Sequence, residues 1–248
     1  MKRLLGLLLL VAWAGGVVTG AWADQPTGQG KIRVLLTYGG HGFEEKPFFA
    51  MFDAMTGIHY TKAELPKEAG LLKPGLEKQY DVLVRYDMVG AFKPEQQQAF
   101  VALLNQGIGL VSLHHNMGAH ANWDEYRKII GGKFALRDCE IDGTKFKKSG
   151  WDHDQELKVT VADKTHTITK GVGDFQIHDE TYSGYYVAPG VKVLLTTDHP
   201  KNNPQLAWTT SYGKSRVCYL MLGHDGKAYQ NPNYSRLVCQ AIRWADGR

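Results

Sequence analysis

The sequence contains few cysteines, and their spacing rules out the usual cysteine-based sites. Cys139, Cys218 and Cys239 lie far apart, which excludes a C-x-x-C redox motif and a zinc ribbon. Cys218 falls within an apolar strand pattern and Cys239 within a helix pattern, so we expect both thiols to fill space in a core. A fold held together by disulfides is therefore not expected.

The chain also lacks a strong excess of charge of either sign. It has 29 Lys and Arg residues against 25 Asp and Glu residues, for a formal net charge of +4. Its one small basic cluster, Lys145, Lys147 and Lys148, is too short to follow a phosphate backbone, and we expect it in a solvated loop. These features argue against a nucleic-acid partner.

Long apolar runs are missing everywhere except at the N-terminus. A basic start, residues 1–3, precedes an apolar stretch over residues 4–18 and the small-x-small sequence Ala21-Trp22-Ala23. This pattern predicts a signal peptide over residues 1–23 and export to the periplasm or the extracellular space. The apolar stretch is short for a retained membrane span. Residues 24–30 read as a polar leader, and residues 31–247 as one domain.

Strand and helix patterns alternate in the first half of this domain, which predicts an α/β fold with a mostly parallel sheet and helices on both faces. The second half reads as strands and loops with a closing helix, and the span 134–183 reads as loop-rich and functional. The predicted strands are 31–38, 58–64, 81–86, 108–113, 156–161, 191–196, 205–210 and 216–222. The predicted helices are 44–55, 94–105, a helix capped by Asn122 and ending at Ile130, and 233–244.

One predicted strand ends abruptly in polar residues. The apolar run Gly109–Leu113 is followed by His114, His115 and Asn116. In open α/β sheets, ligands bind beyond the carboxyl ends of the strands, and imidazole can transfer protons or bind metal there. No Ser or Cys occupies this turn, so a nucleophile of the hydrolase type is not expected. Because side chains alternate along a strand, His114 and His115 are not both expected to face a substrate.

Further polar groups follow other predicted strands, and we expect several of them to meet at one edge of the sheet. A single histidine at a strand end can equally be structural, Asp179 can cap a turn and Tyr182 can pack, so the prediction depends on their convergence. Ligands for a metal such as zinc could come from His41, His114 or His115, His178, Glu180 and His224, with His153 as a further candidate, although no local motif such as H-E-x-x-H is present. The groups are Tyr38, His41 and Glu44; Asp87; His114, His115 and Asn116; His178, Asp179, Glu180 and Tyr182; and His224 and Asp225.

Seven short motifs in order resemble the trehalose-utilisation (ThuA-like) family, which has the class I glutamine-amidotransferase-like fold with flavodoxin-like layering. They are Gly109 to His115, Trp123 to Phe134, His166 to Thr169, Asp179 to Tyr182, Gly213 to Val217, Leu222 to His224, and Ile242 to Ala245.

The sequence departs from the family pattern at three places. Thr167 replaces a proline, Asn203-Pro204 stands where His-Pro is common, and no histidine follows Phe134, which weakens a metal site. The resemblance implies carbohydrate catabolism through 3-keto sugars. With histidine at the turn where an amidotransferase has cysteine, glutaminase activity is not expected.

These observations predict an exported enzyme that acts on a sugar or 3-keto-glycoside by acid/base proton transfer, in a hydrolysis, elimination or isomerisation. Proton transfer is assigned to His114 or His115 with Glu180, and orientation of a keto oxygen to His224 and His41. Two alternatives stay open: a non-catalytic sugar-binding protein or partner of a sugar dehydrogenase, and a metal-dependent hydrolase. The oligomeric state stays open too. The predicted substrate-binding residues are Tyr38, Asp87, Asn116, Trp123, His178 and Tyr182.

Overall fold

A nine-stranded sheet forms the centre of residues 30–247, the part of the chain described by the structure, a computed structural model. The strand order is β2-β1-β3-β4-β13-β12-β11-β8-β9. The predicted signal peptide and residues 24–29 of the predicted leader lie outside the described residues. The strands are β1 Ile32–Gly39, β2 Ile58–Glu64, β3 Val82–Asp87, β4 Gly109–Leu113, β8 Gly150–Val161, β9 Phe175–Ser183, β11 Lys192–Thr196, β12 Gln205–Tyr212 and β13 Ser215–Leu220.

Five strands from β2 to β13 form a parallel half of this sheet. All residues of β3 and β4 are buried. A strand covered by helices on both faces needs apolar side chains on both faces, which explains the consecutive apolar residues 82–84 in β3 and 109–111 in β4. Since these strands run parallel, the carboxyl ends of β1, β3, β4 and β13 lie at one edge, as predicted.

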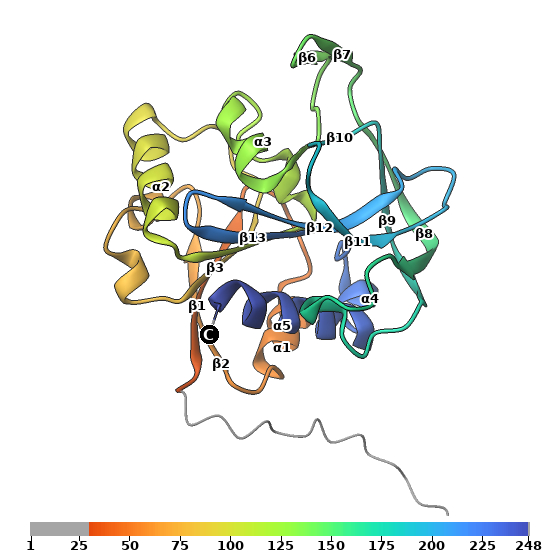
Figure 1. The fold of residues 1–248 in the computed structure, drawn as a ribbon, viewed down its shortest axis with the longest axis horizontal. Coiled ribbons are helices and arrows are strands. Elements are labelled where there is room, and N and C mark those ends of the chain that lie inside the picture. The colour runs from red at the N-terminus through yellow and green to blue at the C-terminus, as the bar shows by residue number, and fades with distance from the viewer. Residues whose placement is uncertain (1–29, 248) are drawn as a thin grey trace, which may run out of the picture. The chain divides into compact units, whose positions relative to one another are not determined.

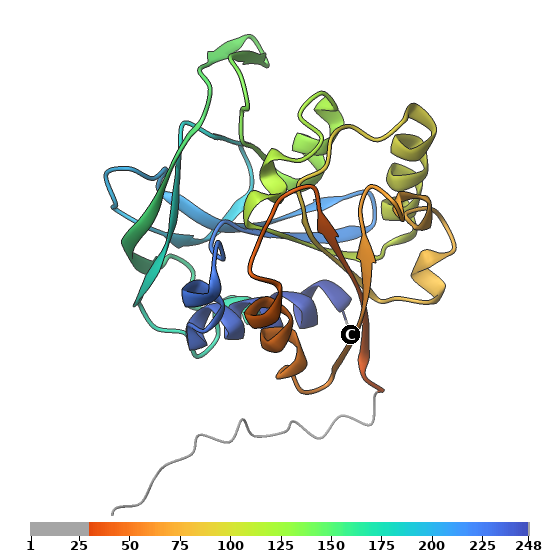
Figure 2. The same cartoon turned by 180° about the vertical axis from the view of Figure 1, so that it is seen from behind.

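Helices cover both faces of the parallel half (Figures 1 and 2). On one face, α4 (Gly226–Tyr229) contacts both α1 (Glu45–Asp53) and α5 (Pro232–Asp246), and α2 (Pro94–Gln106) and α3 (Asp124–Ile130) lie on the other face. The predicted α/β fold class is confirmed. Within the described residues, no helix combines the length and the apolar character needed to cross a bilayer. Short 3-10 helices are η1 Ala69–Leu71, η2 Leu76–Lys78, η3 His114–Gly118 and η4 Thr167–Thr169.

The second half of the chain corrects the prediction of a loop-rich span over residues 134–183. The strands β12, β11, β8 and β9 extend the sheet in antiparallel fashion, and β8 alone has 12 residues. Much of this span is therefore strand. Four short strands, in two further two-stranded sheets, are β5 Gly132–Lys133 with β10 Tyr186–Val187, and β6 Cys139–Ile141 with β7 Thr144–Phe146.

The hairpin of β8 and β9 pairs with the rest of the sheet only near one end, where β8 meets β11 at two register positions. A bulge between Asp152 and Gln155 interrupts the pairing of the two strands. Bulges bend a strand and redirect side chains near active sites. This geometry brings the far part of the hairpin to the edge of the sheet at which β4 and β13 end.

Candidate active site

The turn after β4 places His114 in the interior. Its backbone adopts a left-handed conformation, with φ of 48°, at the first residue of η3. The side chain is fully buried, and its Nδ1–H donates a hydrogen bond to the Met221 carbonyl oxygen over 2.6 Å. A carbonyl oxygen only accepts hydrogen bonds, so this contact fixes the proton on Nδ1 and leaves Nε2 directed toward β9.

The middle of β9 supplies two buried carboxylates, Asp179 and Glu180. Asp179 accepts hydrogen bonds from the backbone N–H groups of Gly223 and His224, over 2.8 and 2.9 Å. It thereby joins β9 to the turn that follows β13. The predicted alternative for Asp179, a turn-capping role, matches these contacts.

The Glu180 carboxylate lies among three imidazoles. Its Oε2 is 3.1 Å from His114 Nε2 and 3.4 Å from His224 Nδ1, and its Oε1 is 3.1 Å from His153 Nδ1. Burial alone would raise the pKa of Glu180, but the hydrogen bonds and charges of His114 and His224 outweigh it and lower that pKa well below the usual range. Glu180 is therefore an ionised hydrogen-bond acceptor at neutral pH.

A cavity of about 370 Å³ opens beside Glu180. Its volume lies within the range of small-molecule sites. One part of its lining is aromatic or apolar and another part is imidazole and carboxylate. The lining residues are His41, Met88, His115, Gly118, Phe134, Leu136, Trp151, His153, Glu180 and Tyr182.

His115 contributes a neutral imidazole to this cavity. Its Nε2–H donates to the Tyr86 carbonyl oxygen over 2.9 Å, and its ring stacks on His41 with 4.6 Å between centroids. Burial, followed by the neighbouring His114 and His41, lowers the pKa of His115 to about 3. The ring thus carries no charge at neutral pH.

The structure gathers six of the eleven predicted site residues here, namely His41, His114, His115, Glu180, Tyr182 and His224. The other five lie away from the cavity. Asp87 is buried in an ion pair with Arg85, and Asn116 bonds to Ser112 and to the Asp87 carbonyl oxygen. Trp123 packs among Phe92, Phe100, His120 and Tyr126, Tyr38 packs on Phe43 and Phe49, and His178 bonds to Asp154 and Glu156.

Several lining residues are absent from the predicted site, and Trp151 is one of them. Its relative exposure of 49% is high for so large an apolar side chain. The segment Trp151-Asp-His153 did attract attention in the sequence, but only because His153 was a candidate metal ligand; Trp151 was not predicted to lie in the site. Met88, Gly118, Phe134 and Leu136 carry no chemical group that a sequence motif would single out.

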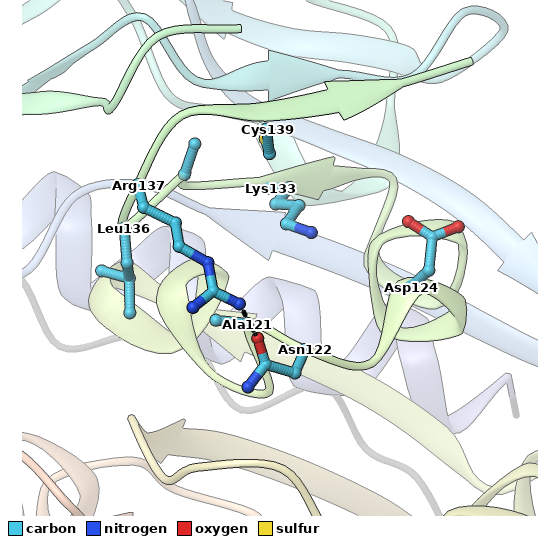
Figure 3. A pocket seen from close by; sticks show the side chains of 8 residues that line it. Ala121, Asn122, Asp124, Lys133, Leu136, Arg137 and Cys139 are labelled. Carbon is cyan, nitrogen blue, oxygen red and sulfur yellow. Dashed lines mark hydrogen bonds between the residues drawn. The ribbon is translucent and has the colours of Figure 1, made fainter. Parts of the chain in front are cut away.

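Figure 3 shows the side chains that line a second cavity, which has a volume of about 530 Å³. Leu136 lines both cavities. In the second cavity the Asn122 Oδ1 accepts a hydrogen bond from Arg137 (Figure 3). Asn122 therefore does not cap α3 as predicted; the N-cap is Trp123, which makes no side-chain capping bond.

Three ligand-type side chains in the described part of the chain converge closely enough to hold one metal ion, namely His114, Glu180 and His224. The other predicted ligands, which are His41, His178, the alternative His115 and the further candidate His153, do not belong to this group. Two imidazoles and one carboxylate form a donor set that suits zinc.

Comparison with known proteins agrees with this architecture. The family model described as trehalose utilisation, ThuA, matches residues 22–245. The chain belongs to the trehalose utilisation family. A comparison of this chain with curated proteins found no match.

Solved structures with the same fold include two proteins described as ThuA-like. The one from Parabacteroides merdae has 20% identity and a TM-score of 0.72, with 87% of this chain and 90% of that chain covered. The one from Bacteroides uniformis has 19% identity and a TM-score of 0.67, with 91% and 95% covered. The β-galactosidase from Rahnella sp. R3 matches at 12% identity and a TM-score of 0.54, and the match covers 87% of the present chain and 32% of the β-galactosidase chain. These likenesses concern the fold.

Proposed function

We propose that this protein is an enzyme that binds a sugar or a 3-keto-glycoside beside Glu180 and transfers a proton on it. The observation that carries the proposal is the pairing of Glu180 with His153 in an aromatic cavity. The ionised Glu180 Oε1 lies 3.1 Å from His153 Nδ1, and in this proposal the His153 proton sits on Nδ1 beside the carboxylate, which leaves the lone pair of Nε2 to take a proton. The side chain of His153 is 54% exposed and lines the cavity.

The cavity lining supports a sugar as the ligand. A pyranose has apolar C–H faces and a rim of hydroxyl groups, so its sites combine aromatic surfaces with a few polar groups. Phe134, Trp151 and Tyr182 supply the aromatic surfaces, and His41 and His115 supply polar atoms. Trehalose utilisation as the family description is consistent with this substrate class.

The arrangement suits an elimination. In a 3-keto-glycoside, the keto group makes the C–H at C2 acidic. His153 Nε2 takes this proton, the electron pair forms a double bond between C1 and C2, and the bond from C1 to the aglycone oxygen breaks. The resulting imidazolium then returns the proton to the departing oxygen, so no Ser or Cys nucleophile is needed. Glu180 keeps the imidazole in the required tautomer.

The burial of His114 favours His153 over His114 as the group that meets substrate, since the His114 side chain has no exposed surface. The pKa of His115, at about 3, makes this imidazole a weak base. In this proposal His114 and His224 hold Glu180, and His115 and His41 bind substrate oxygen atoms.

The proposal is tested by incubating the protein with a panel of glycosides and their 3-keto forms, followed by mass analysis of products. His153→Ala and Glu180→Gln should each lower turnover by about 10²–10⁴, the usual effect of removing a positioned acid or base. His59→Ala and Glu140→Gln replace exposed residues of the same types outside the cavity and serve as matched controls. Both controls should keep wild-type turnover.

Two results would contradict the proposal. Full turnover in both His153→Ala and Glu180→Gln would exclude this proton-transfer assignment. A sugar that binds tightly to the wild-type protein without any turnover across the panel would instead favour a sugar-binding module.

A further inference from the structure

Three ligand-type atoms form a nearly equilateral triangle next to the sugar cavity. The distance from His114 Nε2 to Glu180 Oε2 is 3.1 Å, that from His114 Nε2 to His224 Nδ1 is 3.3 Å, and that from His224 Nδ1 to Glu180 Oε2 is 3.4 Å. In a tetrahedral site with bonds of about 2.0–2.1 Å, neighbouring ligand atoms lie about 3.3–3.4 Å apart. The triangle therefore has the size of one face of a zinc coordination shell.

The contacts behind the triangle hold these atoms in place. His114 donates its Nδ1–H to the Met221 carbonyl oxygen, the same kind of contact that orients metal-bound histidines. The His224 backbone is held by Asp179, which also accepts from Gly223. Glu180 Oε1 faces away from the triangle, 3.1 Å from His153 Nδ1, so only Oε2 belongs to the triangle.

The triangle is closed on one side and reachable on the other. The side chains of His114 and Glu180 are 0% and 5% exposed, whereas that of His224 is 24% exposed. The Tyr182 hydroxyl, which lies 3.0 Å from His114 Nε2, belongs to a residue that also lines the sugar cavity. A set of three protein ligands leaves a fourth position for water or a substrate oxygen, as in catalytic zinc sites.

We propose that His114 Nε2, Glu180 Oε2 and His224 Nδ1 bind one divalent metal ion, with zinc preferred. Two imidazoles and one carboxylate favour zinc over calcium or magnesium, which take mainly oxygen ligands. The metal site deepens the proposed function and rests on it for its role: the ion polarises a keto or hydroxyl oxygen of the sugar while His153 moves the proton.

The test uses the whole mature chain, purified without a histidine tag and dialysed against a chelator. Titration calorimetry with zinc chloride should show one site per chain. Glu180→Gln and His224→Ala should each weaken zinc binding about 100-fold or more, because each removes a direct ligand. Loaded with cobalt(II) instead, the wild-type protein should show the strong visible absorption of a four-coordinate ion, and both variants should lose it.

Three further variants make the assignment specific. His59→Ala, an exposed histidine on β2, should bind zinc like the wild type. His153→Ala should keep one bound zinc but lose turnover, which separates the ligand role from proton transfer. His114→Ala removes a fully buried side chain, so its zinc affinity is compared only after circular dichroism shows a native fold; the two other ligand variants decide the test without it.

The outcomes separate the two proposals. The metal site is overturned if the wild-type protein binds no zinc, or if Glu180→Gln and His224→Ala both bind zinc as tightly as the wild type. In either case the sugar chemistry is judged by its own assay. Zinc bound through these residues without turnover of any sugar supports the metal site and counts against the proposed function.

Discussion

At the scale of single residues, a second buried histidine shows how this fold keeps an imidazole neutral. His120 donates its Nδ1–H to the Gly90 carbonyl oxygen and accepts a hydrogen bond at Nε2 from Arg85, each over 2.9 Å. Arg85 is itself paired with Asp87. Burial, followed by the charge of Arg85, lowers the pKa of His120 to about 3. His120 therefore supports the ion pair below the site without carrying charge.

This environment makes stability depend on pH. In the unfolded chain His120 takes up a proton near pH 6.5, whereas in the folded protein it does so only near pH 3. The stability that His120 contributes is thus fully present above about pH 6.5 and is lost as the pH falls toward 3, at about 1.4 kcal/mol per pH unit. Urea denaturation at pH 7.5, 6.0 and 5.0 should show a smaller loss in His120→Gln than in the wild type. The exposed replacement His59→Gln should keep the wild-type pH dependence; an equal dependence in His120→Gln would contradict the assignment.

At the scale of elements, the turn after β13 determines where His224 lies. Gly223 has a φ of 109°, and a Cβ at this position would overlap the Tyr234 hydroxyl of α5. Its N–H also bonds to Asp179 on β9. The turn is therefore packed against a helix on one side and tied to a strand on the other.

Gly223→Ala should consequently lower the free energy of unfolding by roughly 2–4 kcal/mol, from the unfavourable φ and the steric overlap together. It should also weaken the metal site, because His224 follows directly. Gly173→Ala is the matched control, since a Cβ there meets nothing within 4 Å and its effect should stay within about 0.5 kcal/mol. Denaturant titration of both variants gives the comparison, and equal stabilities would show that the turn adapts.

The elements also explain which parts of the molecule the sequence could predict. Strands such as β4 are buried on both faces, and their sequences are therefore recognisable as apolar runs. The first half of β8 is mostly exposed, so no period of two marks it. In β9 the buried positions include two charged residues: Asp179 bonds to the turn after β13, and Glu180 lies among the site histidines. Because these functional side chains are polar, the sequence of β9 lacks the apolar pattern by which a strand is recognised.

The same reason accounts for the incomplete prediction of the site. Its histidines after β4 and β13 were recognisable because polar residues end apolar strands there. Trp151 was not, since its place in the cavity depends on the path of the β8–β9 hairpin, and Phe134 has no polar group that a sequence pattern would single out. Conversely, Asp87 does end a strand, but its side chain forms a buried ion pair with Arg85 and does not line the cavity. A position at the carboxyl end of a parallel strand predicts that a residue lies near the site. Whether its side chain faces the cavity depends on the packing around it.

At the scale of the whole molecule, we propose that the protein works outside the cytoplasm. The basic start, the apolar stretch and Ala21-Trp22-Ala23 predict cleavage after Ala23. N-terminal sequencing of the exported protein should therefore begin at Asp24. Replacing Ala21 and Ala23 by bulky residues should block this cleavage, and an exported protein that still begins with Met1 would contradict the proposal.

The site joins segments that are distant in the chain. His114 follows β4, Glu180 lies on β9 in the antiparallel half of the sheet, and His224 follows β13 and precedes the last two helices. None of these segments can assemble the site alone, so it exists only once the last strand has paired. A ligand held by all three would bind the native protein and not the unfolded chain, which adds about 2.7 kcal/mol to stability at a concentration a hundred times its dissociation constant. A compound that raises the melting temperature of the protein can therefore be recognised as a ligand before any reaction is known.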